Sequence, residues 1–206
     1  MGLISSSRRA PAVILLLVML TGASSPPVSG DAAFAPELAF SGEAQTYRMT
    51  LTGQTKRKFL FLHVYDIAHY ADSTIDQKDL TPATVIVDGR AKAIAIRFAR
   101  TLSMKRIRKE LRNSIQRNAP PDWLERAERT TERFLEAIDR DAEAGERLVY
   151  YWLPGGRIHA EWNGEVLFTA NDVMFAKLIW LIWFGDDPAC DRDALLALSR
   201  DAKADL

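Results

Sequence analysis

The stretch that most limits the fold of this chain is residues 51–72, LTGQTKRKFLFLHVYDIAHYAD, because both of its faces are largely apolar. Its β-branched and aromatic residues favour a strand over a helix. Alternate residues of a strand share a face, and here neither face is consistently polar. We therefore predict a central strand that is covered on both sides, with a turn at residues 53–55 before it.

The rest of the chain alternates between strand and helix patterns. Strands are expected within 36–52 and at 84–88, 92–99, 148–154, 157–162 and 165–169, and helices at 103–118, 123–145, 173–184 and about 191–203. Ser103 is a typical helix N-cap, and Asn163-Gly164 is typical of a type I′ hairpin turn. This order predicts an α+β domain in which helices stack on one side of an antiparallel sheet.

Composition limits the classes of partner. The 206 residues, 48% of them hydrophobic, suffice for one domain with its own core. Lys+Arg 27 balances Asp+Glu 27, so the overall charge does not favour nucleic acid. The basic helix 103–118 could contact anionic lipid or nucleic acid. The next helix is acidic, however, and we expect the two to pair as solvated faces, so neither contact is indicated.

Residues 1–35 have the pattern of a signal peptide and a linker. Arg8 and Arg9 precede an apolar run at 11–23, which is shorter than the roughly 20 residues of a spanning helix. Cleavage is expected after Ala23 or at the Ala-Phe-Ala of 33–35, and residues 36–206 form the domain. We therefore expect a periplasmic or secreted protein, with an uncleaved signal anchor as the alternative.

No pattern for a metal, a cofactor or a catalytic set is present in the sequence. His63 and His69 would lie about 20 Å apart along a strand, and His159 is distant in sequence. Cys190 is the single cysteine, so no intrachain disulfide can form, and we expect it to be a small buried hydrophobe. No nucleophile elbow marks a catalytic triad.

Several motifs, taken in order, resemble the chalcone isomerase-like superfamily, in particular its bacterial secreted domains. They are Leu51, Gly53, Arg57 and Phe59, then Val64, Tyr65 and Tyr70, FARTLS before a helix, the PGG hairpin, the NG turn and LIWFGDDP at a helix end. The resemblance covers about residues 45–200. It implies an open-faced β-sandwich, in which helices cover one side of a long antiparallel sheet and a ligand cleft lies between them.

The resemblance also implies where ligand contacts would lie. It places the family's anion-binding arginine on Arg57, which in plant fatty-acid-binding relatives holds a carboxylate. The other polar groups of the ring-closing enzymes fall at or near Leu60, Trp123, Thr130 and Ala176, where their residue types are not kept. Ring-closing chemistry is therefore not supported, and a binding protein is expected rather than an enzyme.

The residues themselves are consistent with this site. A guanidinium beside so much apolar strand suits a ligand with an apolar body and an anionic head. The other reading is a solvated basic turn, in which Arg57 pairs with Asp66 or a helix carboxylate. Tyr65 and Tyr70 are candidate contacts, but they point to opposite faces, so at most one joins Arg57. The segments expected to line or back the cavity are Phe59, Leu60, Phe61, Leu62, Val64 and the helix of Trp180.

These observations predict a non-catalytic periplasmic protein that binds a fatty acid or similar amphipathic anion between sheet and helices. The predicted ligand-binding residues are Arg57, Phe59, Leu60, Tyr65 and Tyr70. Two alternatives stay open. One is an isomerase or lyase that uses Arg57 to stabilise an oxyanion, and the other is an interaction module with a filled core and no ligand.

Overall fold

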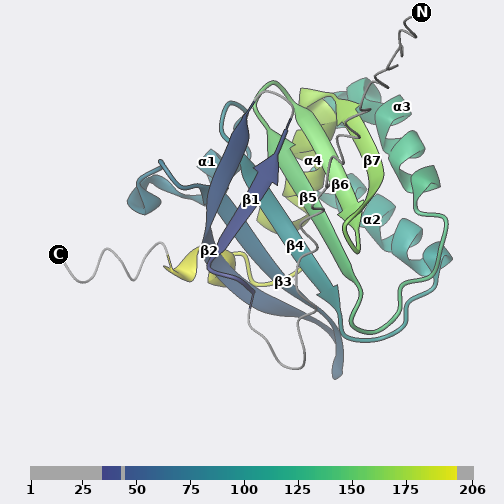
Figure 1. Cartoon of the computed structure of the whole chain (residues 1–206). Coiled ribbons are helices and arrows are strands. Elements are labelled where there is room, and N and C mark those ends of the chain that lie inside the picture. The colour runs from purple at the N-terminus through teal and green to yellow at the C-terminus, as the bar shows by residue number, and fades with distance from the viewer. Residues whose placement is uncertain (1–33, 43–44, 199–206) are drawn as a thin grey trace, which may run out of the picture. The chain divides into compact units, whose positions relative to one another are not determined.

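The computed structural model describes residues 34–42 and 45–198, which fold around one antiparallel sheet (Figure 1). Within these residues seven strands pair in chain order: β1 (Glu37–Ser41), β2 (Thr46–Phe59), β3 (Leu62–Asp72), β4 (Lys92–Phe98), β5 (Arg147–Leu153), β6 (Arg157–Trp162) and β7 (Glu165–Asn171). Every neighbouring pair is antiparallel. The predicted α+β class is therefore confirmed. The predicted signal segment lies, as far as Ala33, outside the described residues.

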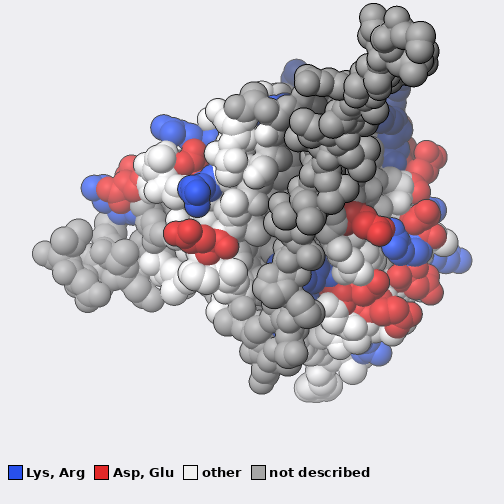
Figure 2. Space-filling model, viewed as in Figure 1, with Lys and Arg blue, Asp and Glu red and all other residues white. Residues whose placement is uncertain are grey.

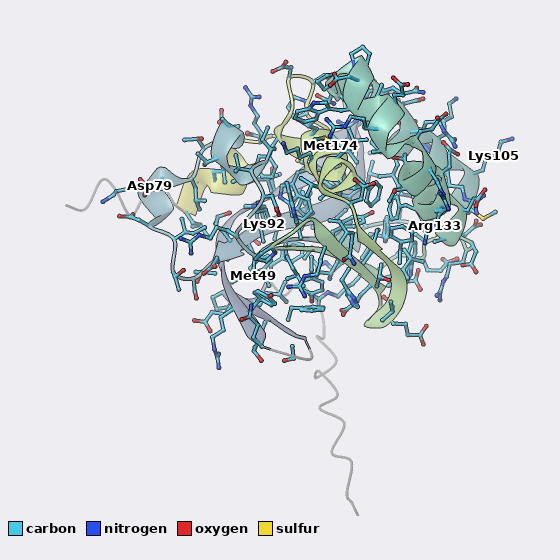
Figure 3. The ribbon with its side chains drawn as sticks, turned by 90° about the horizontal axis from the view of Figure 1, so that it is seen from above. Met49, Asp79, Lys92, Lys105, Arg133 and Met174 are labelled. Carbon is cyan, nitrogen blue, oxygen red and sulfur yellow. The ribbon has the colours of Figure 1, made fainter. Side chains whose placement is uncertain are left out.

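Helices cover one face of this sheet (Figures 1 and 3). The longer helices are α2 (Met104–Asn118), α3 (Pro121–Ala137) and α4 (Val173–Phe184), and the short elements are η1 (Gln77–Asp79), α1 (Pro82–Val85) and η2 (Ala194–Leu196). Helix α4 begins at Asp172, whose carboxylate accepts the backbone N–H of Phe175 at 3.0 Å. Its apolar residues are buried on all sides, which explains why its sequence has no polar face. None of the described helices is long and apolar enough to cross a membrane.

The opposite face of the sheet is covered by the sheet's own edge. Strand β1 and the start of β2 pack against a second apolar cluster that includes Met49, Tyr70 and Tyr151. The ring of Phe40 on β1 lies 4.9 Å from that of Tyr151 on β5, although β1 and β5 are not neighbours in the sheet. The sheet therefore curls. In Figure 3 Met49 lies on the side of this edge, and Met174 on the side of the helices.

The prediction of one strand after a turn at residues 53–55 was wrong. Residues 51–72 form the hairpin of β2 and β3, which turns at Leu60-Phe61, with Phe59 paired to Leu62. The apolar pattern runs through the turn without Gly, Pro, Asn or Asp, so no ordinary turn signal marks it. The predicted turn at residues 53–55 instead lies inside β2. The alternation of faces on β3 was right, because Ile67 joins the helix-side core and Tyr70 the opposite one.

A close backbone approach explains the glycine within β2. A Cβ on Gly53 would lie 2.2 Å from the carbonyl oxygen of Ala194, so η2 packs directly on the bare strand. The Thr52 hydroxyl donates to the carbonyl oxygen of Leu195 at 2.9 Å and lies 2.7 Å from Nδ1 of the buried His69. Of the helix predicted for about residues 191–203, the described part contains the short 3₁₀ helix η2 and helical residues at 197–198, and the rest lies outside the described residues.

Two further predictions need correction. Residues 84–88 contain the end of α1 and a turn instead of a strand, because Asp88 accepts the indole N–H of Trp152 at 2.9 Å and backbone N–H groups of the PGG hairpin. Helix α3 runs from Pro121 to Ala137 instead of over the predicted residues 123–145. The expected pairing of the basic and acidic helices is confirmed by the Arg112–Glu132 ion pair at 2.6 Å.

Candidate ligand-binding site

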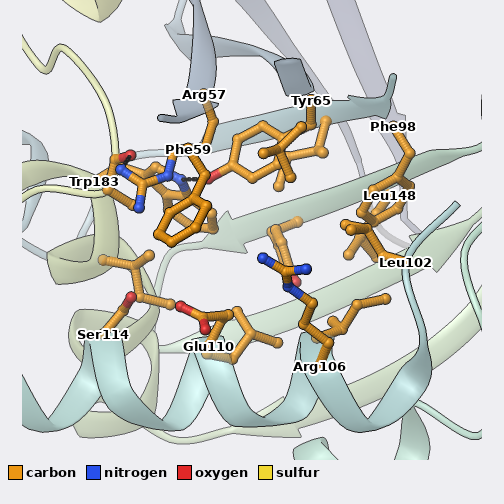
Figure 4. A pocket seen from close by; sticks show the side chains of 17 residues that line it. Arg57, Phe59, Tyr65, Phe98, Leu102, Arg106, Glu110, Ser114, Leu148 and Trp183 are labelled. Atoms are coloured by element: carbon orange, nitrogen blue, oxygen red, sulfur yellow. Dashed lines mark hydrogen bonds between the residues drawn. The ribbon is translucent and has the colours of Figure 1, made fainter. Parts of the chain in front are cut away.

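An apolar cavity lies between the sheet and α2 (Figure 4). Its empty space measures about 760 Å³, part of it open to solvent. The hairpin β2–β3 and the central strands form one wall, α2 the other, and α4 with the segment after it closes one end. The apolar side chains that line the cavity are Phe59, Val64, Ile96, Phe98, Leu102, Ile107, Leu111, Leu148, Ile182, Trp183 and Ala189.

Arg57 lies half-buried at this cavity, opposite Tyr65 in the β2–β3 register. Its Nη1 donates to the carbonyl oxygen of Ala189, which anchors the side chain. A guanidinium has five N–H donors, so others remain for a ligand. Asp66, the alternative partner considered from the sequence, pairs instead with Arg97 at 3.0 Å. Among the residues that the structure describes, no carboxylate forms an ion pair with Arg57.

Helix α2 supplies a second cation to the cavity. The guanidinium of Arg106 lies 5.7 Å from the ring centroid of Phe59, within cation–π range. Figure 4 shows Arg57 and Arg106 extending toward the cavity from opposite walls. Glu110, one turn along α2, also lines it and is exposed. The two arginines against one carboxylate give the rim a net positive charge, which favours an anionic group there.

Two tyrosine hydroxyls lie on the cavity wall, and they differ in their hydrogen bonds. Oη of Tyr65 accepts the indole N–H of Trp183 at 3.1 Å. Tyr150 is 1% exposed, and its Oη has no hydrogen-bond partner among the described residues. Burial raises the pKa of both hydroxyls well above 10.0. Both therefore keep their protons near neutral pH, and Tyr150 has a free O–H to donate to a ligand.

The structure brings only some of the predicted residues together. Arg57, Phe59 and Tyr65 all line the cavity. Leu60 does not: it is 79% exposed at the end of the hairpin. Tyr70 lies on the other face of the sheet, where its hydroxyl donates to the carbonyl oxygen of Ala35 at 2.9 Å. Leu60 thus lies in the exposed turn outside the cavity, and Tyr70 is separated from the cavity by the sheet.

The helix that contains Trp180 does back the cavity, but through other residues. Trp180 itself is fully buried against Trp152, with ring centroids 5.2 Å apart, whereas Ile182 and Trp183 line the cavity. Sequence reasoning missed Arg106 and Tyr150. One feature of the sequence could have indicated Arg106: it is the neighbour of Ile107, which lies on the apolar stripe of that helix. No such feature indicated Tyr150, since it sits in an apolar strand like any core tyrosine.

Cys190 follows the arginine's anchor, Ala189, in the chain. Burial raises the pKa of its thiol to about 12, although Arg57 acts in the opposite direction. The thiol is therefore protonated at neutral pH and is a poor nucleophile. The expected role of Cys190 as a small apolar residue agrees with its packing against the helix-side core.

Comparison with known proteins places the fold in a family. The family model described as chalcone isomerase-like matches residues 36–196. A solved structure of a fatty-acid binding protein from Arabidopsis thaliana aligns with a TM-score of 0.60 and 15% sequence identity, over 83% of this chain and 93% of that one. No curated protein sequence matches the chain. The match over residues 36–196 and the shared fold show that this chain belongs to the chalcone isomerase-like family.

Proposed function

We propose that this protein binds a fatty acid or a similar amphipathic anion in the cavity between the sheet and α2. The observation that carries the proposal is the position of Arg57: a guanidinium without a carboxylate partner among the described residues, at a largely apolar cavity. The Arabidopsis neighbour is a fatty-acid binding protein on the same fold, which supports this ligand class. Because the two sequences are only 15% identical, the proposal rests mainly on the residues of the site.

Each part of such a ligand has a counterpart in the cavity. The chain would contact the apolar side chains of the sheet, α2 and α4, and this burial contributes roughly 25 cal/mol per Å². The head group would accept from Arg57, and a hydrogen bond to a charged group contributes about 1.5–3 kcal/mol. The unpaired hydroxyl of Tyr150 would donate a hydrogen bond to a ligand oxygen or to water.

Binding fits the site better than catalysis does. Tyr65 and Tyr150 stay protonated near neutral pH, and so does Cys190. Among the described lining residues, the one carboxylate is Glu110, which is exposed on α2. A buried general base beside Arg57, which an isomerase or lyase would use to move a proton, is not found among these residues. We therefore propose a carrier or sensor rather than an enzyme.

We further propose that the protein acts in the periplasm or outside the cell. This rests on residues 1–35, where a basic start precedes a short apolar run.

Native mass spectrometry of the protein purified from its own compartment tests the binding proposal. The expected result is a mass above that of the chain, and a lipid or acid in the organic extract. Arg57→Gln should lose this adduct, whereas Arg129→Gln, an exposed arginine on α3, should keep it. A bare mass for the wild type, together with no stabilisation by a panel of fatty acids, would favour the interaction module instead.

A further inference from the structure

The end of the β2–β3 hairpin exposes four apolar side chains in a row. Phe59, Leu60, Phe61 and Leu62, called the hairpin tip from here on, are 49%, 79%, 99% and 50% exposed. Phe61 therefore contacts almost nothing in the fold. Single exposed apolar residues need no explanation, but a contiguous exposed group marks an interaction site.

The tip is also unfavourable as a turn. Leu60 has a φ of 55°, in the left-handed region that glycine and asparagine adopt more readily. A leucine there costs backbone energy, and it places its own side chain and that of Phe61 in water. Neither folding nor solubility is served by these residues. Departures from local rules of this kind occur at functional sites.

Three cations lie near the tip. Lys56 and Lys58 precede it on β2 and are exposed, and Arg106 of α2 lies over the Phe59 ring. The nearby carboxylate of Asp66 is already paired with Arg97 and His63. In Figure 2 the lower end of the molecule, where the hairpin ends in Figure 1, is uncharged, with Lys or Arg close beside it and a group of Asp and Glu above it. Apolar side chains next to exposed lysines match a bilayer interface with anionic head groups.

The tip adjoins the cavity. Phe59 belongs to both, because it lines the cavity and begins the tip. Arg57 and Arg106 lie at the same end. A bilayer in contact with the tip would therefore face the positively charged rim.

We propose that the hairpin tip is a membrane-docking element that inserts into bilayers containing anionic lipids. Leu60 and Phe61 enter the acyl boundary, while Lys56 and Lys58 contact lipid phosphates. Docking needs no ligand in the cavity, so it goes beyond the proposed function and can fail or succeed independently of it.

Vesicle sedimentation tests the proposal with phosphatidylcholine vesicles that contain or lack phosphatidylglycerol. The wild type is expected to bind the anionic vesicles. Because burial of one aromatic side chain is involved, Phe61→Ser should weaken binding about tenfold or more. Lys58→Glu should weaken it about fivefold or more, since it removes one cation and adds an anion. Val166→Ser, which changes an exposed valine (62%) on β7, is the matched control and should bind as the wild type does.

A second pair of measurements separates docking from folding and from the N-terminal segment. Leu60→Asn should raise the melting temperature, because asparagine tolerates the left-handed turn, and should still weaken vesicle binding. Phe61→Trp places an indole at the tip, and the emission of this indole, after subtraction of the native tryptophans, should shift to the blue with anionic vesicles. The second readout reports on the tip itself, whatever else in the chain touches lipid.

Three results would overturn the proposal. One is an absence of binding to anionic vesicles. Another is binding that Phe61→Ser leaves unchanged, with no shift of the indole emission in Phe61→Trp. The third is self-association in lipid-free buffer that Phe61→Ser abolishes while vesicles are not bound, which would assign the tip to a second copy of this chain. Fatty-acid binding by Phe61→Ser in lipid-free solution reports on the cavity separately, because Phe61 does not line it.

Discussion

Tyr65 and Tyr150 line the same cavity, yet only the hydroxyl of Tyr65 has a protein partner among the described residues, the indole N–H of Trp183 at 3.1 Å. The difference gives two otherwise identical substitutions opposite expected effects on the ligand-free protein. Tyr150→Phe removes a buried unpaired hydroxyl, so the free energy of unfolding should stay the same or rise by about 1 kcal/mol. Tyr65→Phe leaves the Trp183 indole unpaired and should lower the free energy of unfolding by about 1 kcal/mol. Urea unfolding of both variants measures this contrast.

In ligand binding, unlike in stability, Tyr150→Phe should have an unfavourable effect. If its hydroxyl donates to the bound molecule, Tyr150→Phe should weaken binding several-fold while the ligand-free protein loses no stability. A Tyr150→Phe variant as destabilised as Tyr65→Phe would show that Tyr150 has a partner in the folded protein, and would contradict the assignment of a free donor.

The contact between Gly53 and the turn η2 predicts a large effect of one methyl group. The Cβ of Gly53→Ala would lie 2.2 Å from the carbonyl oxygen of Ala194, which is backbone and cannot rotate away. We expect a loss of about 2–3 kcal/mol in the free energy of unfolding. Gly42→Ala is the control, because its Cβ would meet its nearest atom at 3.5 Å and should change little. Equal stabilities of the two variants would contradict the close packing of η2 on β2.

The burial of Lys92 should make its contribution to stability depend on pH. It is 4% exposed, with its Nζ 3.9 Å from the ring centroid of Trp152, and burial lowers its pKa to about 8. Between about 8 and the ordinary 10.5 the Lys92 amine holds more protons in the unfolded chain than in the folded one, so its contribution to stability rises with pH in this window. Above about 9 the Cys190 thiol acts in the opposite sense, because its raised pKa keeps it protonated only in the folded chain.

Urea unfolding from pH 7.0 to 8.5, below the ordinary pKa of 9.0 of the Cys190 thiol and of 10.0 of the tyrosines, measures this slope. Lys92→Met should flatten the curve relative to the wild type and should be more stable at the lower end of the range, where the wild type holds a buried charge. Two parallel curves would show that Lys92 titrates alike in both states, against the burial described.

The described residues also bear on the two predicted cleavage sites. Phe34 packs against the apolar cluster on the sheet face opposite the helices, and the carbonyl oxygen of Ala35 accepts from Tyr70 at 2.9 Å. Cleavage after Ala35 would remove both contacts, so we expect the mature chain to begin at Ser24. N-terminal sequencing of the protein from the periplasmic or secreted fraction checks this. A mature start at Pro36 would mean that the domain folds without Phe34 and Ala35.

The sequence predicted the fold wherever local and tertiary signals agreed. Ser103 and Asp172 begin their helices as capping residues should, and Asn163-Gly164 forms the expected turn between β6 and β7. The hairpin of β2 and β3 was missed because Leu60 turns the chain with a residue that normally does not. Residues 84–88 were missed because long-range hydrogen bonds to Asp88 override their strand preference.

The candidate site could be predicted only in part for a similar reason. Arg57 and Phe59 were found through a motif within one strand. Arg106 and Tyr150 come from elements far along the chain, and their place at the cavity depends on how α2 packs over the sheet. Tyr70 was assigned to the ligand by its motif, but the alternation of β3 places it on the opposite face from Tyr65.

Competition binding with a fatty acid and the fatty alcohol of equal chain length tests whether Arg57 binds the anionic head group of the ligand. Both ligands bury the same apolar chain, so the ratio of their dissociation constants isolates the head group. We expect the wild type to prefer the acid by about tenfold or more, since a charge-assisted hydrogen bond contributes about 1.5–3 kcal/mol. Arg57→Gln should lose this preference and still bind the alcohol, while Arg129→Gln should keep it. Equal affinity of the wild type for acid and alcohol, or a preference that survives in Arg57→Gln, would contradict the role of Arg57 as the anion-binding residue.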